Sequence, residues 1–114
     1  MQQSLSALAL TVTAAGIIAA NRFVTPAGAQ AGAGANTLGV CRQAAAAADK
    51  VTVDVLGTAI VEAGAAVSAG DTLKADGAGK AITWATSGAK VGIALEAAGG
   101  AGQMIEVLLI PNAA

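Results

Sequence analysis

The sequence predicts an all-β protein, a small β-barrel or β-sandwich with a weak internal two-fold repeat and an extended N-terminal arm. Three observations support this fold class. Apolar and polar residues alternate in short runs, Gly and Ala clusters separate these runs, and 15 Gly among 114 residues leave little uninterrupted chain for helices. We therefore expect an arm over residues 1–14 and a single β domain over residues 15–114.

The N-terminal segment 5–20 is apolar, but it lacks the features of an export signal. No Lys or Arg precedes it, whereas a signal peptide begins with basic residues, and the segment is too short and too polar for a transmembrane helix. Leu8, Leu10 and Val12 share one side of a period-two pattern. We interpret residues 1–14 as a strand or arm that is ordered only against another chain, with these three residues as candidate partner contacts. A signal peptide is the alternative.

The remaining strands follow in order along the chain. Val51–Val55 alternates as a half-buried strand does, and Ile105–Leu109 repeats the pattern. Between them lie five further β-like runs: Leu38–Arg42, Thr58–Glu62, Asp71–Ala75, Lys80–Thr86 and Val91–Glu96. Ala44–Ala48 is predicted to be a loop or single turn, because five residues cannot meet the nucleation cost of a helix. The Ala/Gly-rich segment 28–34 is predicted to be a surface loop.

A weak internal repeat appears when one half of the sequence is laid on the other. Three pairs of segments match: Ile18–Val24 with Val67–Leu73, Leu38–Arg42 with Val91–Leu95, and Val51–Val55 with Ile105–Leu109. Asn21 falls opposite Gly70, and both residue types tolerate positive φ. We therefore predict one structural turn used twice, at Asn21 and at Gly70. Chance similarity in an Ala/Gly-rich chain is the alternative.

The composition excludes several classes of function. Without His there is no Ser-His-Asp triad and no His metal site, and one Cys cannot form an internal disulfide or a zinc knuckle. Six scattered basic residues and two aromatic residues provide neither a phosphate-binding patch nor a stacking platform for nucleic acid. We predict no enzyme, no catalytic or metal-binding residue, no cofactor, and neither nucleic acid nor membrane as a partner.

The low charge indicates an assembly. Only 11% of residues are charged, the mean hydropathy is +0.68, and soluble surfaces normally carry about 25–35% charged residues. We expect much of the surface to be covered by partners, although a monomer coated with Ala would have the same composition.

Few side chains are candidates for a specific role. Gly77–Lys80 lacks the residues of a phosphate-binding P-loop. Arg42 could lower the pKa of its neighbour Cys41, but a lone Cys in a strand is usually a small packing residue. Trp84 is predicted to anchor either the core or an interface, since Trp is enriched at binding hot spots, and we include it among the candidate partner contacts.

One motif suggests a modified protein. Val67–Leu73 resembles the V-x-x-G-D-x-L turn of biotinyl and lipoyl carrier domains, which would make Lys80 the modified lysine. The residues that usually flank that lysine are missing here. A carrier domain is therefore kept as an alternative function.

A second resemblance covers nearly the whole chain. The matching segments are Ile18–Val24 with its Thr25-Pro26 continuation, Leu38–Val40, Ala63–Asp71, Val91–Ala98 and Ile105–Leu109. In these segments the sequence resembles the capsid cement, or head decoration, proteins of tailed bacteriophages. Cys41-Arg42 departs from the Ala-Leu that such proteins often carry at this place.

This resemblance implies a structural protein. Such a protein is made in the cytoplasm of the bacterial host and binds the outer capsid surface of the virion, where it bridges neighbouring subunits of the major capsid protein. It also implies a homo-oligomer, with a trimer favoured over a dimer. A fibre or tail accessory protein would differ only in its place on the particle.

Overall fold

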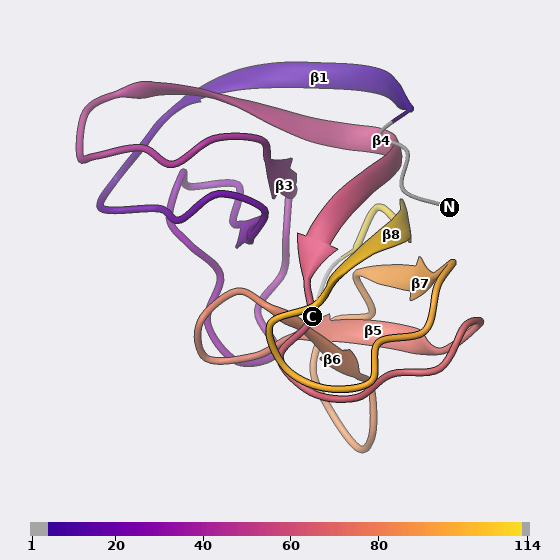
Figure 1. The fold of residues 1–114 in the computed structure, drawn as a ribbon. Coiled ribbons are helices and arrows are strands. Elements are labelled where there is room, and N and C mark those ends of the chain that lie inside the picture. Colours follow the sequence, from indigo (N-terminus) through magenta and orange to yellow (C-terminus); the bar gives the residue numbers. More distant parts are fainter. Residues whose placement is uncertain (1–4, 113–114) are drawn as a thin grey trace.

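Eight strands make up the fold of residues 5–112, the part of the chain that the computed structural model describes (Figure 1). They are β1 (Ser6–Thr13), β2 (Phe23–Val24), β3 (Gly39–Cys41), β4 (Lys50–Glu62), β5 (Thr72–Ala75), β6 (Ala81–Thr83), β7 (Gly92–Ala94) and β8 (Met104–Leu109). They form one sheet in the order β2-β3-β4-β8-β7-β5-β6, and β1 pairs with β4 beside this path. The sheet nearly closes into a barrel, where the backbone N–H of Phe23 donates to the carbonyl of Gly79 at 2.9 Å.

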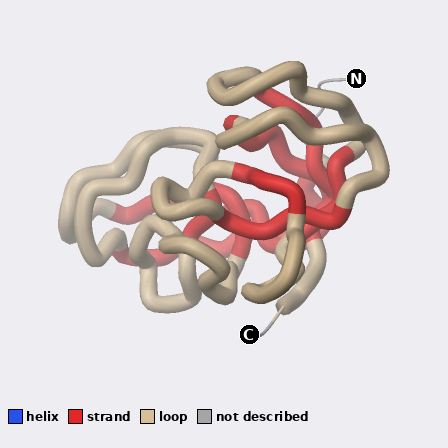
Figure 2. Tube along the Cα trace, turned by 90° about the horizontal axis from the view of Figure 1, so that it is seen from below, coloured by secondary structure: helices blue, strands red, loops and turns tan. Residues whose placement is uncertain are grey.

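The predicted all-β fold class is confirmed. Within residues 5–112 no segment is helical, and short strands alternate with loops (Figure 2). Ala44–Ala48 lies in a loop, as expected. The run predicted over Lys80–Thr86 is shorter, since β6 covers only Ala81–Thr83.

The two runs predicted at Val51–Val55 and Thr58–Glu62 are one strand, β4, which continues through Gly57. Gly57 has a φ of 103°. A Cβ at this position would lie 2.0 Å from the carbonyl oxygen of Leu5, so only glycine fits. Near Gly57 the partner of β4 changes from β1 to β8.

The predicted extended arm is not confirmed. Its central part forms β1 and pairs antiparallel with β4 of the same chain, from Ser6 opposite Gly57 to Thr13 opposite Lys50 (Figure 1). The strand character of this segment is as predicted. Residues 1–4 of the predicted arm lie outside the described residues.

Two hydrophobic cores lie along β4. A small core contains Val51 and Val53 together with residues of the loops and strands from Ala14 to Ala45. A main core contains Val61 and Ala59 together with most of the buried residues that follow β4. The part of β4 before Gly57 contributes to the small core and the part after it to the main core, so one long strand contributes to both cores.

The strand pairing is similar in the two parts of the chain that the predicted repeat relates. We call residues 6–55 the first half and residues 56–109 the second half. Pairs in the first half have counterparts in the second: Leu10–Val53 and Ala59–Val107, Val12–Val51 and Val61–Ile105, Phe23–Val40 and Thr72–Ile93, Val40–Asp54 and Ile93–Leu108. The halves therefore share one pairing scheme, in which β4 ends the first half and begins the second.

The two predicted turns occupy equivalent places in this scheme. Asn21 has a φ of 59° and Gly70 a φ of 91°. The N–H of Asn21 donates to the carbonyl of Cys41 at 3.1 Å, and the N–H of Gly70 donates to the carbonyl of Ala94 at 2.7 Å. Each turn directs the chain into the short strand that follows it.

Substituting Gly70 with valine should lower the free energy of unfolding by about 1–2 kcal/mol, because a β-branched residue is strained at positive φ. The space around Gly70 is open, so the loss reports backbone strain rather than a clash. The matched control is Gly77→Val, at a glycine that has neither positive φ nor an atom near its Cβ position. Urea denaturation measures both variants, and equal losses would contradict the turn assignment.

Candidate partner-binding surfaces

The described residues do not assemble a metal site. Among residues 5–112 no three His, Cys, Asp or Glu side chains lie close enough together to hold a metal ion. In the same part of the chain, no helix has the length and apolar character needed to cross a membrane.

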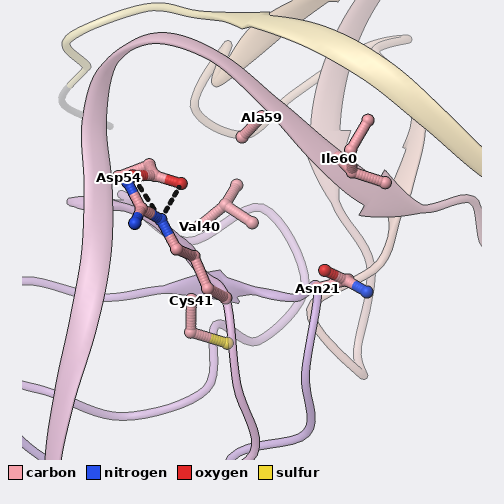
Figure 3. A pocket seen from close by; sticks show the side chains of 7 residues that line it. Asn21, Val40, Cys41, Asp54, Ala59 and Ile60 are labelled. Atoms are coloured by element: carbon pink, nitrogen blue, oxygen red, sulfur yellow. Dashed lines mark hydrogen bonds and ion pairs between the residues drawn. The ribbon is translucent and has the colours of Figure 1, made fainter. Parts of the chain in front are cut away.

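A small pocket of about 170 Å³ lies beside β3 and β4, next to the turn at Asn21 (Figure 3). Its polar feature is an ion pair in which Arg42 Nη2 donates to Asp54 Oδ1 at 2.6 Å and Arg42 Nε donates to both carboxylate oxygens at 2.9 and 3.0 Å. The Asp54 side chain is 1% exposed, whereas that of Arg42 is 49% exposed. The hydrogen bonds and charge of Asp54 raise the pKa of Arg42. The pair neutralises a buried carboxylate and contains no nucleophile.

Cys41 lies in the wall of the same pocket, but its sulfur points away from the Arg42–Asp54 pair (Figure 3). The side chain is buried in the small core, and Sγ donates to the carbonyl of Ala19 at 3.0 Å. Burial raises the pKa of the Cys41 thiol, which keeps it protonated and unreactive. The predicted influence of Arg42 on Cys41 is wrong, because Arg42 binds Asp54 instead. Cys41 is a packing residue.

A second charged cluster connects β4 with the hairpin between β5 and β6. Glu62 accepts from Arg22 Nη2 at 3.1 Å through Oε1 and from Lys80 Nζ at 3.0 Å through Oε2. The hydrogen bond from Lys80, together with Arg22, holds the pKa of Glu62 below its usual range. The amine that a carrier domain would present for modification is therefore held in an ion pair, which does not favour the carrier alternative.

The three candidate contacts on β1 lie on one strand, but they differ in exposure. Leu8 and Leu10 are 42% and 41% exposed, whereas Val12 is half-buried against the small core. Among the described strands, β1 pairs with β4 alone. An uncharged edge strand with exposed leucines is a typical site of contact with another chain.

Sequence reasoning missed other exposed apolar residues. They are Leu5, Ile17, Met104 and Leu108. The alternation that places Ile105 and Val107 inside puts Leu108 on the opposite face, but it does not decide exposure, since Glu106 on that face is 1% exposed. Leu108 is 40% exposed and lies opposite Ile93 of β7.

Trp84 lies on the loop after β6. It is half-buried. Its Nε1 donates to the carbonyl of Gly88 at 2.8 Å, and Lys90 Nζ lies 4.5 Å from the ring centroid. These contacts hold the indole on the loop, and the assignment of Trp84 to an interface stays a prediction.

Comparisons with known proteins agree with this arrangement of strands. Among solved structures, the chain is similar to the head fiber gp8.5 N base of bacteriophage phi29, with a TM-score of 0.74 and 20% identity over 94% of this chain and 97% of that one. At this identity the likeness shows a shared fold. No curated protein matches the sequence. The family model described as phage cement protein matches residues 1–109, and the chain therefore belongs to the phage cement protein family.

Proposed function

We propose that this protein decorates the outer surface of an assembled phage head, bridges neighbouring subunits of the major capsid protein and so stabilises the shell. Membership of the phage cement family supports a structural, capsid-associated role and a location on the virion. The family match over residues 1–109 is the observation that carries the proposal. The proposed role requires no catalysis and no cofactor.

The surface of the molecule suits this role. The exposed side chains of β1 are uncharged, and six large hydrophobic residues are exposed among residues 5–112. Association that covers this apolar surface is favourable, because it removes the exposed side chains from water. A homo-oligomer on the shell needs contacts both to the shell and between copies, and the chain offers two candidate surfaces for them: the β1 surface with Leu8, Leu10 and Val12, and the loop with Trp84.

The proposed mechanism is a gain in binding free energy across the seams of the shell. A site built from two neighbouring capsid subunits exists only when they are correctly spaced, so the protein binds the assembled state and shifts the equilibrium toward it. Individual contacts can be weak, because a homo-oligomer, with a trimer favoured over a dimer, engages several subunits at a high effective concentration.

The protein is expected to bind assembled, expanded shells and to raise their resistance to heat, without measurable affinity for free capsid subunits. Trp84→Ala should weaken shell binding about tenfold or more, as expected for an interface anchor. The control Lys50→Ala removes an exposed charge and its exposed hydrogen bond to Thr13 Oγ1 and should have little effect, since exposed charges contribute little. Co-sedimentation of purified protein with shells measures the affinities.

The dependence of shell binding on salt concentration is an independent test of the proposal. Because only 11% of residues are charged, binding should survive physiological salt, which screens exposed charges beyond about 8 Å. Binding that disappears between low and physiological salt, or equal affinity for free subunits, would contradict the proposal.

A fibre base is the second candidate function. The solved structure with the same fold is described as the base of a head fiber, and such a base would bind the head while carrying a further chain. Electron microscopy of labelled particles separates the two functions, because a cement protein covers the shell at many sites and a fibre base lies under projecting fibres.

A further inference from the structure

The two halves of the chain have equivalent cores that differ in how completely they are covered. Every residue of the small core has a counterpart at the equivalent position in the main core. Examples are Ile18 and Val67, Val24 and Leu73, and Val53 and Val107. The equivalence extends to two isolated bridges, Ile18–Ala45 in the first half and Val67–Ala98 in the second.

The main core is larger because the first half covers it. Phe23 and Val40 point to the face of β2 and β3 opposite Val24 and Cys41, and both belong to the main core. They are 0% and 1% exposed. One face of the first half therefore packs onto the inner face of the second half.

The small core lacks such a cover among the described residues. Leu10 of β1 is 41% exposed, whereas its counterpart Ala59 is 1% exposed. Leu38 and Val55 are half-buried, and Val12 likewise packs only partly against the small core. Their counterparts in the second half are all buried. We call the surface of Leu8, Leu10, Val12, Leu38 and Val55 the open face.

The second half carries the opposite feature, a covering face that residues 5–112 cover only in part. The counterparts of Phe23 and Val40 are Thr72 and Ile93, which are half-buried. Ile93 lies opposite Leu108, which is 40% exposed. We call the surface of Thr72, Ile93 and Leu108 the free covering face.

The free covering face is more apolar than its counterpart inside the chain. Leu108 stands where the first half has Asp54, and Leu95 stands where it has Arg42. The first half thus has an ion pair between the half-exposed Arg42 and the buried Asp54 at these positions, whereas the second half has leucine at both. Neither the open face nor the free covering face contains a charged residue.

We propose that copies of this chain associate head to tail, with the free covering face of one copy packed onto the open face of the next, as the two halves pack within one chain. The inference rests on the self-association in the proposed function and assigns it a geometry. Such an interface is heterologous and closes into a ring when the rotation between copies allows it. The backbone N–H of Trp84 donates to the carbonyl of Thr72 at 2.8 Å, so the Trp84 loop borders the free covering face.

Two single variants, Leu10→Glu on the open face and Leu108→Glu on the free covering face, test this geometry by sedimentation velocity. The unmodified protein is expected to be an oligomer. Each variant alone should associate about 100-fold more weakly, because the interface would then bury an unpaired charge. Ile17→Glu is the matched control, since Ile17 is 85% exposed and lies on neither face.

Mixing the two variants gives the decisive result. A Leu10→Glu chain keeps its free covering face and a Leu108→Glu chain keeps its open face, so the mixture should form a 1:1 dimer and nothing larger. That dimer also shows that both variants are folded. If either variant fails to fold by circular dichroism, Leu10→Thr and Leu108→Thr replace the pair, with an expected weakening of about tenfold each.

Other outcomes would overturn the inference. Self-association of Leu108→Glu that equals that of the unmodified protein would indicate a symmetric contact between two open faces. An unmodified protein that remains a monomer, or a mixture without dimers, would also overturn it. Shell binding of the same proteins is measured separately. A monomer that still binds shells would contradict only the head-to-tail association. An oligomer that does not bind shells would contradict only the cement proposal.

Discussion

Replacing Phe23 with alanine is expected to lower the free energy of unfolding by about 3–5 kcal/mol, the usual cost of removing a fully buried aromatic side chain. Phe23 is 0% exposed and carries the packing of the first half onto the main core. Its backbone N–H also closes the sheet by donating to the carbonyl of Gly79. The substitution leaves this hydrogen bond available, so the loss reports side-chain packing between the halves.

Urea denaturation followed by circular dichroism and by Trp84 fluorescence measures this loss. The matched control is Ile17→Ala, because Ile17 is 85% exposed, and it should change stability by less than about 0.5 kcal/mol. Both probes should give one transition, since removing the packing weakens the main core itself. A loss below about 1.5 kcal/mol for Phe23→Ala would show that the halves do not depend on this contact.

The substitution Gly39→Ala is expected to cost about 2–3 kcal/mol, at the upper end for overpacking. A Cβ at Gly39 would lie 1.9 Å from the carbonyl oxygen and 2.8 Å from the carbonyl carbon of Asp54. Because these are backbone atoms of the neighbouring strand, β3 would have to move away from β4. Gly39 does not have positive φ, so the cost is steric.

Gly77→Ala is the matched control for this substitution, since a Cβ at Gly77 meets no atom within 4 Å. Its effect should stay within about 0.5 kcal/mol. The equivalent glycine of the second half, Gly92, would place a Cβ 2.5 Å from Val107 Cγ1 and 2.8 Å from the carbonyl oxygen of Leu108. Gly92→Ala should therefore destabilise in the same direction. A neutral Gly39→Ala would mean that β3 and β4 are less closely packed than described.

The strands could be predicted because alternation is a local signal. Val51–Val55 and Ile105–Leu109 alternate clearly, and both lie in strands. The sequence does not predict that β4 is one continuous strand, because Gly57 interrupts the alternation and a glycine usually marks the end of a strand. The pairing of β1 with β4 could not be predicted either, since alternation shows which face of a strand is apolar but not which distant strand lies beside it.

A side-chain prediction succeeded where the property is local in the sequence and failed where it depends on a contact between different strands. The turns at Asn21 and Gly70 follow from residues that tolerate positive φ, and both have it. The binding of Arg42 to Asp54 depends on the register between β3 and β4, which the sequence does not express. The assignment of Leu8, Leu10, Val12 and Trp84 to partners stays a prediction, because it concerns chains outside this molecule.

The continuity of β4 has a consequence for the order of events during synthesis on the ribosome. The strands of the first half are complete once Val55 has been made, but Thr58–Glu62 must wait for β8, which ends at Leu109. At about 5–20 residues per second, this interval lasts about 2–9 s. During this interval the second part of β4 lacks β8 along one edge. In this interval the unpaired edge of β4 can pair wrongly with a nascent chain on a neighbouring ribosome. Synthesis of β8 ends the interval, because β8 then pairs with this edge.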